Sequence, residues 1–189
     1  LLAPAAFGLF AIANLVVLFI NFFVRMGLAS ALVQKRDLFE QEIRAASTAG
    51  VAVGLACLVL IWILAPAVAA LFREPDLPPI LRGLGVSFVF MGWSMTGLGL
   101  LRREHRFRTL SMITVGTYVF GYLVVGVGLA LLGAGVWSLV AASVATTAAQ
   151  AIWQYAIVRH PLRPVLRWEP YQAVCGYGAR LSGAYLMDY

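Results

Sequence analysis

Five long apolar runs constrain what this chain can fold into. Within them only Arg25 and Arg82 are charged, and the runs cover residues 7–33, 45–72, 80–101, 109–132 and 135–158. About 20 mostly apolar residues in a helix are enough to cross the hydrocarbon core of a bilayer. A sixth apolar run begins near Tyr171. The sequence therefore predicts an all-α fold: a polytopic membrane helix bundle with about five complete transmembrane helices and the start of a sixth.

The composition excludes an ordinary soluble domain and offers no chemistry for an enzyme. Hydrophobic residues make up 62% of the chain and charged residues 12%, against roughly 45–50% and 25% in soluble proteins. The two cysteines, Cys57 and Cys175, are too few for a disulfide framework. There is no Cys/His cluster with metal-ligand spacing, and neither His105 nor His160 has a nucleophile nearby in sequence. We therefore expect no enzyme activity, no cofactor and no metal.

The basic residues predict how the chain is oriented in the membrane. Ten of the 14 lie in three alternate connections, 34–44, 102–108 and 159–170. Alternate connections of a membrane bundle lie on one side, and cytoplasmic loops carry the excess of Lys and Arg. These three loops are therefore predicted to be cytoplasmic. This topology also accounts for the net charge of +6, so no nucleic-acid partner is expected. A further role of the basic loops in binding anionic lipid head groups stays open.

Ionisable residues within the apolar runs are the first candidates for a functional role. Arg25, Arg180 and Asp188 each lie inside a predicted span. Such groups are costly in a bilayer and usually face a bundle interior or a watery cavity, although an arginine near a helix end can also snorkel to the interface. We interpret the two arginines as anion-binding candidates and Asp188 as an ion-coupling or pairing candidate.

Uncharged polar residues are the second group of candidates. Asn21 interrupts the first run, and Thr146, Gln150 and Gln154 follow one another at four-residue spacing on one helix face. Such a stripe either lines a hydrophilic cavity or bonds one helix to another. Small residues recur at the same spacing, at Gly50/Gly54 and Ala142/Thr146. They predict places where two helices approach closely.

Several short motifs, in this order, resemble the bacterial polysaccharide flippases, also called lipopolysaccharide exporters, of the multidrug/oligosaccharidyl-lipid/polysaccharide exporter superfamily. The most specific is Gly27-Leu-x-x-Ala-Leu-Val-Gln34, which ends the first run. The others are Leu64-Ala-Pro66 with the turn Glu74-Pro75, then Leu101-x-x-Glu104-x-x-Phe107-Arg108, Gly133-x-Gly-Val-Trp-Ser-Leu139, and the segment from Tyr177 to Tyr189. One departure is Arg25, whose position is often acidic in these flippases.

The resemblance implies a transporter that flips a polyprenyl-pyrophosphate-linked oligosaccharide across the bacterial cytoplasmic membrane by alternating access. Residues 1–168 would be the N-terminal transmembrane lobe without its first helix, and residues 169–189 the start of a second lobe. The substrate would meet Arg25, Arg180, Asn21, Gln150 and Gln154, with Asp188 as the coupling group. Partners would be the lipid-linked oligosaccharide, membrane lipids, glycan polymerase and glycosyltransferases.

Two other functions remain open from the sequence. One is a drug or small-molecule cation antiporter of the same fold, which would need acidic residues inside the lobe. The spans before residue 180 contain none. The other is a membrane scaffold that does not transport and anchors glycan-assembly enzymes through its basic loops.

Overall fold

The computed structural model of the chain describes residues 7–21 and 40–159, and in these ranges it consists of helices and short connections. Four helical segments are long and apolar enough to cross a membrane: Ile43–Phe72, Leu77–Arg103, Phe107–Leu131 and Val136–Val158. They match the four predicted runs between residues 45 and 158. The all-α membrane bundle is therefore confirmed. Of the first predicted run, only the part that forms the helix Phe7–Asn21 lies in the described residues.

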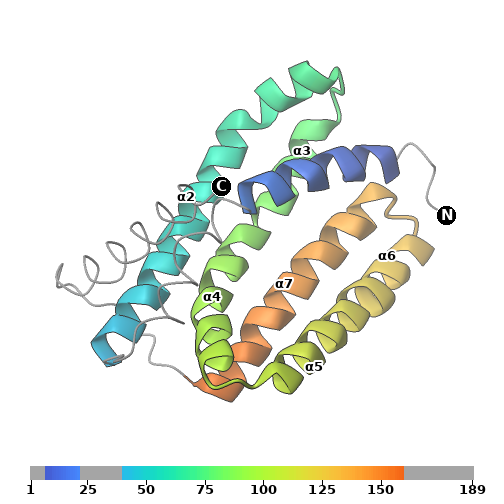
Figure 1. Cartoon of the computed structure of the whole chain (residues 1–189). Helices are drawn as coiled ribbons and strands as arrows, with labels where there is room; N and C mark the ends of the chain where they lie inside the picture. Colours follow the sequence, from blue (N-terminus) through green and yellow to red (C-terminus); the bar gives the residue numbers. More distant parts are fainter. Residues whose placement is uncertain (1–6, 22–39, 160–189) are drawn as a thin grey trace, which may run out of the picture.

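The spans are built from seven elements arranged in a row. They are α2 (Glu40–Phe72), α3 (Leu77–Gly85), α4 (Ser87–Arg103), α5 (Phe107–Tyr118), the π-helix η1 (Val119–Gly126), α6 (Val127–Leu131) and α7 (Val136–Val158). α2 packs on α4, α4 on α7, and α7 on α5 and η1. The helix Phe7–Asn21, drawn in blue, runs across this row in Figure 1.

The second span differs from the single helix that the sequence predicts. It begins at Leu77 and divides into α3 and α4 at Val86, where the backbone stays in the right-handed helical region. We expected the proline-rich segment 73–79 to separate two helices. The separation is shorter, because Pro78 and Pro79 occupy the first turn of α3, where the missing N–H groups need no partner.

The third span contains a π-helix that no sequence pattern predicted. Residues 119–126 adopt this wider turn, and Gly121 and Gly126 face α7 there. A Cβ atom on Gly121 would overlap the Thr146 hydroxyl, and one on Gly126 would lie 3.1 Å from the Ala142 Cβ atom. The spacing of Ala142 and Thr146 thus marks a close approach of two helices, as predicted.

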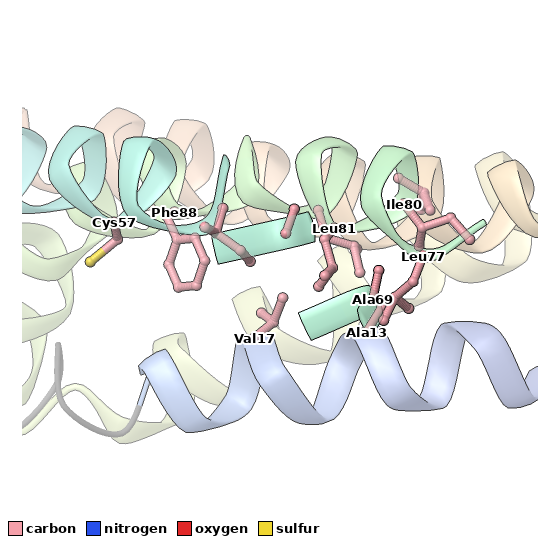
Figure 2. Close-up of a cluster of buried hydrophobic side chains, with 12 residues drawn as sticks. Ala13, Val17, Cys57, Ala69, Leu77, Ile80, Leu81 and Phe88 are labelled. Atoms are coloured by element: carbon pink, nitrogen blue, oxygen red, sulfur yellow. The ribbon is translucent and has the colours of Figure 1, made fainter. Parts of the chain in front are cut away.

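The apolar core lies between the helix Phe7–Asn21, α2, α3 and the start of α4. Figure 2 shows Ala13 and Val17 of the first helix near Ala69 of α2, with Leu77, Ile80, Leu81 and Phe88 from α3 and α4. Many large apolar side chains outside this core remain exposed, including Leu71, Leu123 and Leu132. An outer surface of this kind suits lipid rather than water.

Candidate polar cavity between α4, α5 and α7

A small cavity with a polar wall lies where α4, α5 and α7 meet. Its volume is about 260 Å³. α4 contributes Met91, Ser94, Met95, Leu98 and Arg102, α5 contributes Thr114, and α7 contributes Thr147 and Gln150. Drug-sized ligands usually occupy cavities of ~300–1,000 Å³. This cavity is therefore suited to a small polar group or to one part of a larger molecule.

The three hydroxyl groups in the cavity wall all donate to their own helices. Ser94 donates to the Met91 carbonyl at 3.1 Å, Thr114 to Leu110 at 2.9 Å, and Thr147 to Val144 at 2.9 Å. A hydroxyl has one proton and two lone pairs. Because the proton is already used, each oxygen presents an acceptor to whatever occupies the cavity.

Arg102 supplies charge and hydrogen-bond donors at one end of the cavity. It stands in the last turn of α4, and its side chain is exposed. Within the described ranges, its guanidinium group forms no ion pair, whereas the nearby Arg106 lies 3.5 Å from Glu104. The five N–H donors of Arg102 are therefore available to a ligand. Gln150 adds an amide that can both donate and accept.

The basic residues gather at the end of the bundle where Arg102 lies. The start of α2, the connection between α4 and α5, and the end of α7 lie at this same end in Figure 1. These segments carry Arg44, Arg102, Arg103, Arg106, Arg108 and Arg159. The opposite end carries the connection with Arg73, Glu74 and Asp76. The cavity is therefore closer to the cationic end of the molecule.

A second, larger cavity lies at the opposite end, between the helix Phe7–Asn21, α3 and α7. Its volume is about 630 Å³, and its lining includes Glu74, Asp76, Ile12, Pro79 and Trp137. The two carboxylates repel an anionic ligand. In the described residues no three His, Cys, Asp or Glu side chains come together as a metal site would need. The arginine-lined cavity is the better candidate for an anionic substrate.

Thr146, Gln150 and Gln154, the predicted polar stripe on α7, lie in three different surroundings. Gln150 lines the cavity, whereas Gln154 is buried against α4, where a Cβ atom on Gly97 would lie 3.1 Å from the Gln154 Cβ atom. Neither polar atom of the Gln154 amide has a hydrogen-bond partner. Thr146 donates to the Ala142 carbonyl and faces η1. One member of the stripe thus lies at the cavity and two lie at helix contacts.

The remaining predicted site residues lie elsewhere. Asn21 ends the first helix, and its Oδ1 atom is buried without a partner. Arg25, Arg180 and Asp188 lie outside the described residues, as does the predicted lobe boundary at residues 168 and 169, so these stay predictions. Sequence reasoning assigned Arg102 to membrane topology, with a contact to lipid head groups left open, and did not place it at a substrate site. The spacing of Ser94, Leu98 and Arg102 at four-residue intervals would have placed them on one helix face.

The whole chain, residues 1–189, matches the family model of polysaccharide biosynthesis proteins. The chain belongs to this family. With four membrane-length helices in its described residues, it is an integral multi-pass membrane protein, and the predicted family resemblance is confirmed.

Three curated proteins illustrate the relationship. The succinoglycan biosynthesis transport protein ExoT of Rhizobium meliloti is 26% identical over 189 residues, which is 100% of this chain and 38% of ExoT. The lipopolysaccharide biosynthesis protein WzxC of Escherichia coli is 21% identical over 116 residues, covering 61% of the chain and 24% of WzxC. The teichuronic acid biosynthesis protein TuaB of Bacillus subtilis is 27% identical over 104 residues, or 54% of the chain and 22% of TuaB. No solved structure matches the chain.

Proposed function

We propose that this protein belongs to a transporter that flips a polyprenyl-pyrophosphate-linked oligosaccharide across the bacterial cytoplasmic membrane. The oligosaccharide would be a repeat unit of O-antigen, capsule or exopolysaccharide. One observation carries the proposal: membrane-length helices enclose a cavity with hydroxyl, amide and guanidinium groups in its wall. Sugars and phosphates cross about 30 Å of hydrocarbon only if protein groups replace their water. Family membership agrees with this substrate class.

The proposed cycle is alternating access between two lobes. The chain spans 38% of the length of ExoT. The second lobe, which would form the opposite wall of the transport path, is therefore part of the proposal. One bundle would rock against the other around the polar path. Arg25 and Arg180 would bind the pyrophosphate, because a guanidinium group can bind phosphate oxygens in pairs. Asn21 and Gln150 would contact the sugar, whereas Gln154 is buried at the contact with α4. Asp188 would couple the cycle to an ion, and the lipid tail would remain in the bilayer.

The proposed orientation places loops 34–44, 102–108 and 159–170 in the cytoplasm. The clustering of basic residues at one end of the bundle supports it, because cytoplasmic loops carry the positive excess. A variant without native cysteines, with Arg106→Cys or Asp76→Cys added, tests it in intact cells. A membrane-impermeant thiol reagent should label the Asp76→Cys variant alone. Labelling of the Arg106→Cys variant alone would reverse the orientation.

The partners proposed are the lipid-linked oligosaccharide, the surrounding lipids, and the glycan polymerase and glycosyltransferases that would act before and after transport. A decisive experiment deletes the gene in its host and measures both surface glycan and lipid-linked precursor. We expect surface glycan to fall and the precursor to accumulate on the cytoplasmic face. Unchanged glycan, with no precursor accumulated, would contradict the transport function.

The roles of the two arginines are tested by complementing that deletion with Arg25→Ala and Arg180→Ala variants. Each should lower the export rate while the protein remains in the membrane at normal abundance. If both variants restore full export, the pyrophosphate is bound by other residues.

A further inference from the structure

We infer that the cavity between α4, α5 and α7 binds the junction of the substrate, its first sugar together with the adjoining phosphate. This inference rests on the proposed function and adds a subsite to it. Arg102 would bind the phosphate, and the hydroxyl oxygens of Ser94, Thr114 and Thr147 would accept hydrogen bonds from the sugar.

The division of donors and acceptors in the cavity wall favours a sugar next to a phosphate as the ligand. A cavity for a bare anion would direct N–H and O–H donors toward it from all sides. Here the hydroxyl protons of Ser94, Thr114 and Thr147 are directed to carbonyl groups of their own helices. With these bonds in place, their oxygens accept hydrogen bonds from sugar hydroxyls, whereas binding a bare anion would require each hydroxyl to turn away from its carbonyl. Among the described residues that line the cavity, only Arg102 and the amide of Gln150 offer donors, and only Arg102 offers positive charge.

The size and position of the cavity fit one part of a lipid-linked glycan. A volume of about 260 Å³ lies below the usual range for drug-sized ligands, ~300–1,000 Å³, so a complete oligosaccharide does not fit. Met91, Met95 and Leu98 add apolar walls that suit the C–H faces of a sugar ring. Arg102 marks the end toward the basic loops. A ligand in this cavity would therefore enter from the proposed cytoplasmic side, where the transported molecule is made.

Binding measurements with matched substitutions test the site. The complete protein, as its host makes it, is placed in lipid nanodiscs. It is then titrated with three probes: farnesyl diphosphate carrying one glucose, farnesyl diphosphate, and inorganic pyrophosphate. Arg102→Gln should weaken binding of both lipid probes roughly tenfold to a hundredfold, the range for loss of a charged hydrogen bond. Arg108→Gln removes the same charge from the same end without touching the cavity, and should change affinity less than about threefold.

The sugar contact has its own matched pair. Thr147→Val removes a hydroxyl oxygen from the cavity and should weaken binding of the glucose-bearing probe roughly fivefold, leaving farnesyl diphosphate unaffected. Thr146→Val changes a hydroxyl that faces η1 and should leave both affinities unchanged. Arg102→Lys keeps the charge and should restore part of the affinity. This variant provides a second test of the site if Arg102→Gln does not fold.

Three outcomes would overturn the inference. Equal losses of affinity in the Arg102→Gln and Arg108→Gln variants would show that Arg102 acts only as a general surface charge. Equal affinity for inorganic pyrophosphate and both lipid probes, all lost with Arg102→Gln, would show a site for free anions. No effect of Thr147→Val on the glucose-bearing probe would remove the sugar contact. Transport by the wild-type protein is measured separately, so a failure of the proposed function is distinguished from a failure of this site.

Discussion

α4 packs against a different kind of surface on each of two sides. Toward α2, Gly92 meets Gly50, and a Cβ atom on either residue would overlap the carbonyl oxygen of the other. Toward α7, Gly97 meets the large polar side chain of Gln154, and a cavity with a polar wall adjoins this contact. The first interface holds two backbones together without room for a side chain. The second interface holds a large polar side chain and leaves open space beside it.

The difference shows that a small residue does not define an interface by itself. A glycine opposite a glycine brings two helix backbones together, as small residues in membrane helices commonly do. A glycine opposite glutamine admits a long side chain instead. We therefore expect the α2–α4 contact to contribute stability and the α4–α7 side to contribute function. The following substitutions test this contrast.

The largest effect is expected for Gly92→Ala. The obstacle is the Gly50 backbone, which no rotamer change removes, so the two helices must separate. Overpacking of this kind costs about 1–3 kcal/mol. Unfolding in detergent by a denaturant measures it. Gly128→Ala in α6 is the control, since nothing lies within 4 Å of that position; it should be neutral or stabilising. Equal stability of the two variants would contradict the tight contact.

Gln154→Met should stabilise the protein by about 1 kcal/mol. The amide is buried with both polar atoms unpaired, and a buried group without a hydrogen bond costs about 1–3 kcal/mol. Methionine has a similar length and no such requirement. The same unfolding assay measures the change, with Gln150→Met at the cavity wall as a control expected to stay within about 0.5 kcal/mol. A loss of stability for Gln154→Met would mean that the amide has a partner.

Gly116→Ala should cost less than Gly92→Ala, about 1 kcal/mol. A Cβ atom there would lie 2.7 Å from the ring of Trp153 on α7, so the obstacle is a side chain rather than backbone. Trp153→Leu should therefore recover the stability lost with Gly116→Ala, and a double-mutant cycle measures this coupling. If the two effects simply add, the ring of Trp153 is not the obstacle.

The smallest effect is expected at the cationic end of α2. Glu40 and Arg44 form an ion pair one helical turn apart, with 66% and 30% of their side chains exposed. Pairs of this kind contribute only about 0.3–0.5 kcal/mol. Glu40→Gln should lower stability by that amount at low salt and by less at high salt, because exposed charges are screened. A loss above about 1 kcal/mol would show that charge at this end stabilises as strongly as the glycine contact.

The sequence was sufficient to predict the spans because the thickness of the hydrocarbon core sets the length of the apolar run that crosses it. It also predicted the close approaches at Gly50 and Ala142. It did not predict the π-helix at residues 119–126, which depends on how α7 packs against it. The cavity was only partly predicted. Gln150 was a candidate, but Arg102 was interpreted as a topology signal with a lipid contact left open, since charge counts do not reveal which arginine borders a cavity.

The contrast between the two sides of α4 is tested most directly by thiol accessibility. In a variant with Cys57→Ala and Cys175→Ala, Ser94→Cys places a thiol in the cavity wall. Thr96→Cys places one on the side of Gly92, one turn further along α4, where Thr96 is 0% exposed. A small hydrophilic thiol reagent should label the Ser94→Cys variant and leave the Thr96→Cys variant unlabelled in the folded protein. Equal labelling, or labelling of the Thr96→Cys variant alone, would contradict a polar cavity on one side of α4 and a dry contact on the other.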